Sequence, residues 1–287
     1  MITHKQLYLH NRQVIQSDLS GFLGAFREFE ERWIRSCLQD LRIDERPLSF
    51  GQLTDQLDQL IEEEASAESE EVRFVEERIT LEQFRILVQE FALDGLTEAQ
   101  SFYYIMPRLP LPAQLPMLRI LIDEFGSANP SRMHTTLYIN LLKELQMPTD
   151  IPYYLEKISD AGFAFVNHFY WLTIRADDPS YFAGSITYLE SIIPHLFPCY
   201  TTACKRLGIK AHHYYSEHCH IDHFHAIEGR RLLQAMARQG CLDADKAWLG
   251  ARLTQAITNH TFNEALRKAV TAAAATGEFG HANSTVQ

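Results

Sequence analysis

Residues 217–225 read Glu-His-Cys-His-Ile-Asp-His-Phe-His, and no other stretch of the chain is as informative. His218, Asp222 and His225 are separated by four and then three residues, so on an α-helix their side chains share one face. Two imidazoles and one carboxylate form a mixed ligand set that suits iron, manganese or zinc. The stretch therefore predicts a metal-binding helix face. The alternative is a solvated histidine cluster, because the chain has 13 histidines and several crowd this segment.

Glu190 is predicted to lie in the middle of an apolar helix stripe. Phe182, Ile186, Ile193 and Phe197 stand at helical neighbour positions around it. An ionised carboxylate without a partner is costly to bury, so such a group usually has a raised pKa, an ion pair or a metal. An arginine partner is the alternative to a metal here.

Glu124 ends another apolar helix face, and His134 follows a break between Gly126 and Pro130. The break allows both side chains to turn toward a common point. Glu124 with His134, Glu190 and the triplet of residues 218–225 would then come from three helical regions. Helical bundles build carboxylate-bridged dimetal centres in this way, and the donor set favours iron or manganese over copper.

The composition favours a small-molecule substrate over a polyanionic partner. The chain has 287 residues and a net charge of −11, so a nucleic-acid or anionic membrane surface is not expected. No apolar run is long enough to span a bilayer, and the first residues lack the apolar region of a secretory signal, so a cytoplasmic protein is expected. Five cysteines without a C-x-x-C pair indicate neither a disulfide framework nor a cysteine zinc site.

Hydrophobic periodicity is helical throughout, which predicts an all-α fold in a single domain over residues 1–287. Residues 1–80 are expected to form N-terminal helices with an acidic exposed connection at 65–71, and residues 276–287 a loose tail. In the first helix, Phe22, Phe26, Phe29 and Trp33 are expected to be core residues. Helices are predicted over residues 19–41, 50–64, 80–91, 97–107, 113–125, 131–145, 152–174, 178–208, 212–239 and 243–274.

At its candidate metal-binding residues the chain resembles the haem-oxygenase-like diiron oxidases, a family of iron-containing redox enzymes. The resemblance is carried by Asp-Gly-Leu-Thr-Glu-Ala at 94–99, Asp-Glu-Phe-Gly at 123–126 followed by His134, the isolated Glu190, and the H-x3-D-x2-H pattern at 218–225. It implies a bundle of about seven core helices without haem, here with extra N-terminal helices. It also implies two ferrous ions that activate dioxygen as a peroxo-diferric intermediate.

The resemblance also suggests how the ligands are shared. Glu98 stands where the N-oxygenating branch of the family carries an extra carboxylate ligand; its alternative explanation is a favourable position in the first turn of a helix, worth about 0.3–1 kcal/mol. The expected distribution, listed by ion, is Glu124, His134 and His218 on one iron, Asp222, His225 and Glu98 on the other, and Glu190 as the bridge and catalytic residue.

The implied function is O2-dependent N-oxygenation of a small amine or amino-acid-like substrate, with an external electron donor. One alternative is desaturation or oxidative C–C cleavage of an amino or fatty acid at the same centre. Another is an iron-binding protein without turnover, and a third is a cofactorless helical hydrolase or scaffold. Arg230 and Arg231 could receive a substrate carboxylate but are explained more simply as solvated residues. A homodimer is a further expectation.

Overall fold

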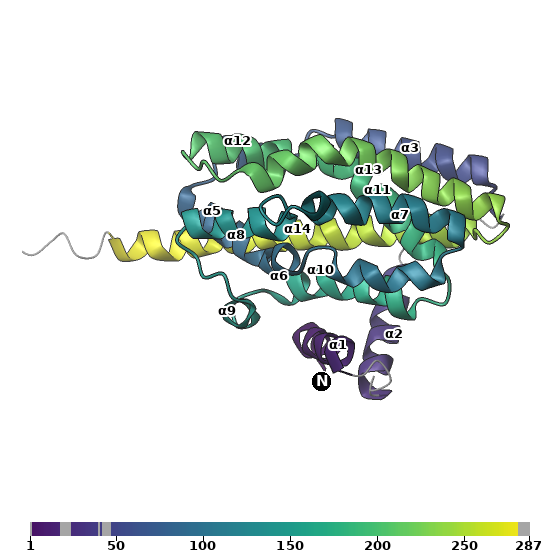
Figure 1. Cartoon of the computed structure of the whole chain (residues 1–287). Helices are drawn as coiled ribbons and strands as arrows, with labels where there is room; N and C mark the ends of the chain where they lie inside the picture. Colours follow the sequence, from purple (N-terminus) through teal and green to yellow (C-terminus); the bar gives the residue numbers. More distant parts are fainter. Residues whose placement is uncertain (1, 18–23, 40, 42–46, 281–287) are drawn as a thin grey trace, which may run out of the picture.

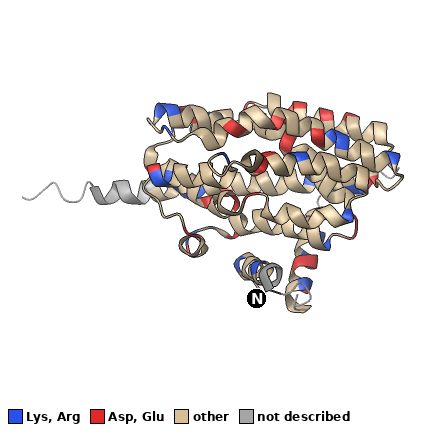
Figure 2. Ribbon diagram, in the orientation of Figure 1, with Lys and Arg blue, Asp and Glu red and all other residues tan. Residues whose placement is uncertain are grey.

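The computed structural model describes residues 2–17, 24–39, 41 and 47–280, and every regular element in these residues is a helix. The predicted all-α fold is therefore confirmed. None of the described helices combines the length and the apolar character needed to cross a membrane. Lys and Arg are scattered over the elements in the view of Figure 2 and do not gather on one face.

The bundle consists of long helices that lie roughly side by side (Figure 1). They are α3 (Phe50–Ser66), α5 (Leu81–Glu90), α7 (Leu111–Glu124), α8 (His134–Glu144), α10 (Asp160–Tyr170), α11 (Ser180–Leu196), α13 (His213–Arg238) and α14 (Ala244–Gly280). Shorter elements connect or flank them: α1 (His4–Ser17), α2 (Gly24–Gln39), α4 (Glu70–Glu77), α6 (Ala92–Thr97), α9 (Ile151–Leu155), α12 (Pro198–Arg206), the 3-10 helices η2 (Gln100–Arg108) and η3 (Gly126–Ala128), and the π-helix η4 (Trp171–Arg175).

Helix α11 is the centre of the bundle because it packs against both α13 and α14 over most of its length. Almost all of its residues are buried, as expected for a helix that is apolar on every side. Gly184 and Gly250 permit the close approach of α11 and α14. A Cβ atom at Gly184 would clash with the carbonyl oxygen of Ala247, and one at Gly250 with that of Tyr181.

Local signals in the sequence explain several helix boundaries. Ser49 with Gln52, and Thr80 with Gln83, form capping boxes that begin α3 and α5. Gly126 ends α7 in the left-handed region at φ +61°, a conformation that favours glycine. The predicted helices 50–64, 113–125 and 212–239 are confirmed within a few residues.

Other predicted helices are wrong in their boundaries. The helix expected from Ser131 begins only at His134, because residues 129–132 form a turn. The expected helix 152–174 is divided into α9 and α10, and 178–208 into α11 and α12. The break expected near Gly95 lies instead at Glu98 and Ala99, where Ala99 has φ 56°, while Gly95 is helical and packs under the Tyr138 ring.

The N-terminal helices lie at one side of the bundle (Figure 1). Helix α1 was not predicted, and α2 begins at Gly24, so Phe22 lies outside the described residues. Phe26, Phe29 and Trp33 are only half-buried. All three contact histidines of α1, and Trp33 also packs against the hydrophobic core. Helix α4 was not predicted either, and it shortens the exposed connection to residues 67–69.

Candidate metal centre

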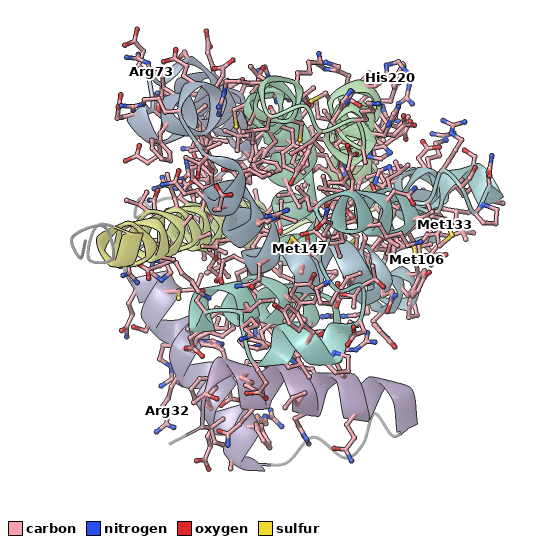
Figure 3. The ribbon with its side chains drawn as sticks, turned by 90° about the vertical axis from the view of Figure 1, so that its left-hand side faces the viewer. Arg32, Arg73, Met106, Met133, Met147 and His220 are labelled. Atoms are coloured by element: carbon pink, nitrogen blue, oxygen red, sulfur yellow. The ribbon has the colours of Figure 1, made fainter. Side chains whose placement is uncertain are left out.

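The predicted triplet of α13 faces the interior of the bundle. His218, Asp222 and His225 are 3%, 0% and 1% exposed, respectively. His220 and His223 on the same helix are exposed, and His220 lies at the outer edge of the molecule in Figure 3. The triplet is therefore a buried face of polar groups, and a solvated surface cluster does not explain it.

Four further predicted residues meet this face from other elements. Glu124 ends α7, His134 begins α8 after the break at Gly126, Glu190 lies in the middle of α11, and Glu98 follows the last residue of α6. The side chains form two groups, in each of which one ligand atom per residue lies within 4.8 Å of the others. The first group is Glu98, Glu124, His134 and His218, and the second is Glu124, Glu190, Asp222 and His225.

Glu124 belongs to both groups, and its two carboxylate oxygens point in different directions. Oε2 lies 2.7 Å from His134 Nδ1 in the first group. Oε1 lies 3.6 Å from His225 Nδ1 in the second group. A carboxylate that offers one oxygen to each of two neighbouring positions has the geometry of a bridging ligand.

This grouping differs from the distribution expected from the sequence. Glu98 was expected beside Asp222 and His225, but it lies beside His218, because α6 packs against α8 and brings Glu98 to the His134 side of the centre. Glu190 was expected to bridge. Instead it belongs to one group, with Oε2 3.1 Å from His225 Nδ1, and Glu124 takes the shared position.

The position of Glu98 in the structure does not agree with the alternative explanation, a favourable place in the first turn of a helix. It is the C-terminal cap of α6, the end of a helix at which the dipole disfavours a carboxylate. Its Oε1 lies 3.2 Å from His218 Nε2 and accepts a hydrogen bond of 3.3 Å from the Tyr214 hydroxyl. Favourable interaction with a helix N-terminus therefore does not account for Glu98.

The arginine alternative for Glu190 is also excluded within the part of the chain that the structure describes. The ion-pair partner of Glu190 there is His225, and no lysine or arginine pairs with it. Arg230 and Arg231 instead pair with Asp58 and Glu228, which supports their interpretation as solvated residues.

Burial and close charges shift the pKa values of the centre strongly. Burial raises the pKa of Glu190 to about 7, against the opposing effect of His225. Burial acts to lower the pKa of His225, but Glu190 and Asp222 outweigh it and raise that pKa to about 11. Burial likewise opposes the low pKa of Glu124, but His134 and the other histidines hold it at about 2. Such opposed shifts among neighbouring buried groups are typical of functional sites.

Two of the imidazole rings are oriented by groups outside the two clusters. His218 Nδ1 lies 2.7 Å from the carbonyl oxygen of Tyr214, which leaves Nε2 facing the first group. His225 Nε2 lies 3.5 Å from Asp123 Oδ2, which leaves Nδ1 facing the second. Metal-binding histidines typically have such a second partner, which fixes the tautomer and the ring orientation.

Asp123, Tyr214 and Asp94 were not predicted as site residues. Asp123 adjoins Glu124, while Tyr214 and Asp94 stand four residues before His218 and Glu98, so helical spacing could have found the last two. Burial, and then the neighbouring Glu98, raise the pKa of Asp94 well above its usual range. The raised pKa favours the protonated form of Asp94 beside the first group of ligands.

The donor atoms fit a pair of cations. Both carboxylate oxygens of Asp222, Nδ1 of His134 and Oε2 of Glu98 are buried without a hydrogen-bond partner. His134 Nδ1 approaches Glu124 closely but is not aligned with it as a hydrogen bond. Buried polar atoms are rarely left unpaired, and a metal ion would satisfy these. Carboxylates and imidazoles together suit iron or manganese.

A cavity of about 450 Å³ adjoins the centre. Glu98, Glu124, Glu190 and His218 are part of its wall, and the rest is mostly apolar and aromatic. It reaches from the centre to the end of α3 and to α14. Its size and its mixture of apolar walls with a few polar groups are those of a small-molecule site.

Binding of Fe(II) to the metal-free protein is expected to release protons. The pKa of His225 is raised to about 11, so this residue is protonated near neutral pH, and the raised pKa of His218 favours its protonated form. A metal must displace these protons. The affinity should therefore fall as the pH is lowered, by about tenfold per unit for each proton displaced. Calorimetric titration in two buffers of different ionisation enthalpy measures this number. Equal heats in the two buffers would contradict the expectation.

Comparisons with known proteins agree with the presence of a metal centre at these residues. Residues 85–259 match the family model described as iron-containing redox enzyme. Nitrosourea synthase from Streptomyces achromogenes subsp. streptozoticus is 24% identical over 155 residues, which are 51% of this chain and only 31% of that protein. The chain thus matches about a third of the length of this curated relative.

A solved structure supports the fold. A domain of unknown function with a heme oxygenase-like fold from Shewanella denitrificans OS217 superposes with a TM-score of 0.57 at 14% sequence identity, over 84% of this chain and 98% of that one. The family model covers more than half of the chain and includes every residue of the two ligand groups. The chain therefore belongs to the iron-containing redox enzymes of the haem-oxygenase-like fold.

Proposed function

We propose that the protein is a non-haem diiron oxygenase that transfers one oxygen atom from O2 to the nitrogen of a small amine or amino-acid-like substrate. The amine and O2, with two electrons and two protons from an external donor, give a hydroxylamine and water. Two iron ions bound at the centre would supply the activation of O2. The observation that carries the proposal is the position of Glu124 between two complete ligand groups.

In this proposal the residues of the centre and their neighbours have different roles: binding the metal ions, orienting the histidines and holding a proton. Glu98, His134 and His218 would hold one ion, Glu190, Asp222 and His225 the other, and Glu124 both. Tyr214 and Asp123 orient the two histidines of α13. Asp94, whose pKa is raised, can hold a proton beside the first group.

Two observations favour N-oxygenation over C–C cleavage or desaturation. Glu98, the carboxylate that the resemblance associates with the N-oxygenating branch, contacts His218 inside the first group. The relative with a curated name is a nitrosourea synthase, and its name implies formation of a bond to nitrogen. Both observations support the proposed reaction, whereas the low identity leaves the substrate to be found by experiment.

The test is to load the metal-free protein anaerobically with two equivalents of Fe(II), add a candidate amine and a reductant, and then admit air. We expect O2 uptake that depends on the amine, and a product whose mass is larger by one oxygen atom, labelled from 18O2. An alkene or a shortened carbon chain would instead indicate desaturation or C–C cleavage. Iron uptake without O2 consumption with any amine or acid would indicate an iron-binding protein and contradict the proposal.

A further inference from the structure

Apart from two histidines, the charged side chains in the wall of the cavity beside the metal centre are all acidic. Its carboxylates are Glu64, Glu71, Asp94, Glu98, Glu124 and Glu190. Its basic groups are the imidazoles of His195 and His218, and no described residue of the wall is a lysine or an arginine. Outside the metal centre, a substrate carboxylate would therefore find no lysine or arginine along the wall, whereas ammonium and guanidinium groups would find the carboxylates of Glu64 and Glu71.

Two arginines on the elements that flank the Glu64 end of the cavity have contacts of their own. Arg252 on α14 lies over the Trp248 ring, 5.5 Å from its centroid. Arg73 on α4 pairs with Glu68 and Glu70, and its side chain lies at the outer edge of the molecule in Figure 3. Neither residue belongs to the wall of the cavity.

Glu64 is a fixed acceptor in the part of the cavity wall that α3 contributes, and it belongs to neither ligand group. It lies in the last turn of α3, where α3 packs against α11 and α14. The Tyr188 hydroxyl and the Gln255 amide both donate to its Oε2, at 2.7 and 2.8 Å. These bonds hold the carboxylate in place, and neither of them neutralises its charge.

Two further polar groups lie near that end. Thr258 Oγ1 on α14 is buried without a hydrogen-bond partner, and Thr258 is part of the wall. Glu71 is exposed, and Ser69 donates to its Oε2 at 3.0 Å. The end of the cavity thus offers a fixed anion, an unpaired hydroxyl and a second carboxylate at its rim.

Between the metal centre and Glu64 the wall is aromatic and aliphatic. Phe165, Phe169, Phe197 and Phe262 contribute rings, and Leu189 and Ile193 of α11 contribute aliphatic side chains. Such a wall suits a chain of methylene groups, and the faces of the rings attract cations. The cavity therefore has the metal centre at one end, the carboxylates of Glu64 and Glu71 at the other, and an apolar middle.

From this charge distribution we infer that the substrate is an alkyl diamine or a guanidinoalkylamine without a carboxylate group. One nitrogen faces the metal centre, and the ammonium or guanidinium at the other end binds Glu64, with Glu71 at the rim. The inference rests on the proposed function and narrows its substrate class. It makes Glu64 the residue that selects for a second positive charge.

The ligand test compares pairs that differ only in the carboxylate. Agmatine is paired with arginine and 1,5-diaminopentane with lysine, and n-pentylamine lacks the second nitrogen. Binding is measured by calorimetry to the Fe(II)-loaded protein under nitrogen and to the metal-free protein. We expect each decarboxylated member to bind at least about tenfold more tightly than its amino acid, because like charges at close range repel strongly. Equal or tighter binding of the amino acids would overturn the inference.

The residue test uses Glu64→Gln, which keeps an amide oxygen to accept from Tyr188 and Gln255. It should weaken the binding of 1,5-diaminopentane by about three- to tenfold, the scale of a partly exposed ion pair, and leave n-pentylamine unchanged. Glu62→Gln is the matched control, because Glu62 is exposed on the same helix and is not part of the wall. An equal loss in both variants, or no loss in Glu64→Gln, would contradict the role of Glu64.

Failure of this inference can be distinguished from failure of the proposed function. If diamines bind selectively through Glu64 and the iron-loaded protein leaves them unoxidised, the substrate class stands and the oxygenase proposal fails. If the protein N-oxygenates arginine or lysine in preference to agmatine or 1,5-diaminopentane, the oxygenase proposal stands and the inference is wrong.

Discussion

Replacing Glu124 by alanine is expected to remove iron from both positions of the centre and to lower O2-dependent turnover by about 100-fold or more. The carboxylate of Glu124 contributes one oxygen to each ligand group, so its loss takes a donor from both. Glu98→Ala should be less severe, because Glu98 belongs only to the first group and the second keeps all its donors. Iron per chain, measured after anaerobic loading and desalting, should fall well below one in Glu124→Ala and to about one in Glu98→Ala.

The control for this pair is His223→Ala. His223 is an exposed histidine on the same helix as the triplet, so iron content and turnover should match those of the parent. Circular dichroism checks that each variant keeps its helices. If Glu124→Ala kept both ions, or if Glu98→Ala lost as much iron as Glu124→Ala, the shared position of Glu124 would be wrong.

The second large effect is on stability. Gly184→Ala is expected to lower the free energy of unfolding by about 3 kcal/mol, because the new methyl group would clash with the backbone carbonyl of Ala247 on α14. Neither backbone can move easily, since α11 and α14 form the most extensive helix contact of the bundle. For a chain of 287 residues the loss corresponds to a fall in Tm of roughly 5 °C.

Gly51→Ala provides the comparison for Gly184→Ala. Gly51 lies on α3, and a Cβ atom there would have no other atom within 4 Å, so the substitution should be neutral or slightly stabilising. Urea unfolding of the metal-free proteins measures both changes. Equal midpoints for Gly184→Ala and the parent protein would show that the α11–α14 contact is looser than described.

Most of the candidate ligands could be predicted from the sequence because they break a local pattern. Asp222 and the two histidines share a helix face, Glu190 interrupts an apolar stripe, and Glu124 precedes a glycine that ends a helix. These are properties of single helices, which depend on short-range periodicity. The resemblance added Glu98, which no helical pattern distinguishes from an ordinary surface glutamate.

The division of the candidate ligands between the two groups could not be predicted from the sequence in the same way. Whether Glu98 lies near His218 or near Asp222 depends on how α6 packs against α8, and whether Glu124 or Glu190 is shared depends on the spacing of α7, α11 and α13. The start of α8 was missed for a related reason. Asn129 and Pro130 form a sound helix start in isolation, yet the chain turns there and begins the helix at His134, which brings that ring to the centre.

The most direct test of the central claim is anomalous X-ray diffraction at the iron edge from crystals of the protein loaded anaerobically with Fe(II). We expect two iron peaks about 3.5–4 Å apart, the usual spacing in two-metal sites, with one oxygen of Glu124 directed to each. A single peak, or two peaks of which only one contacts Glu124, would contradict it.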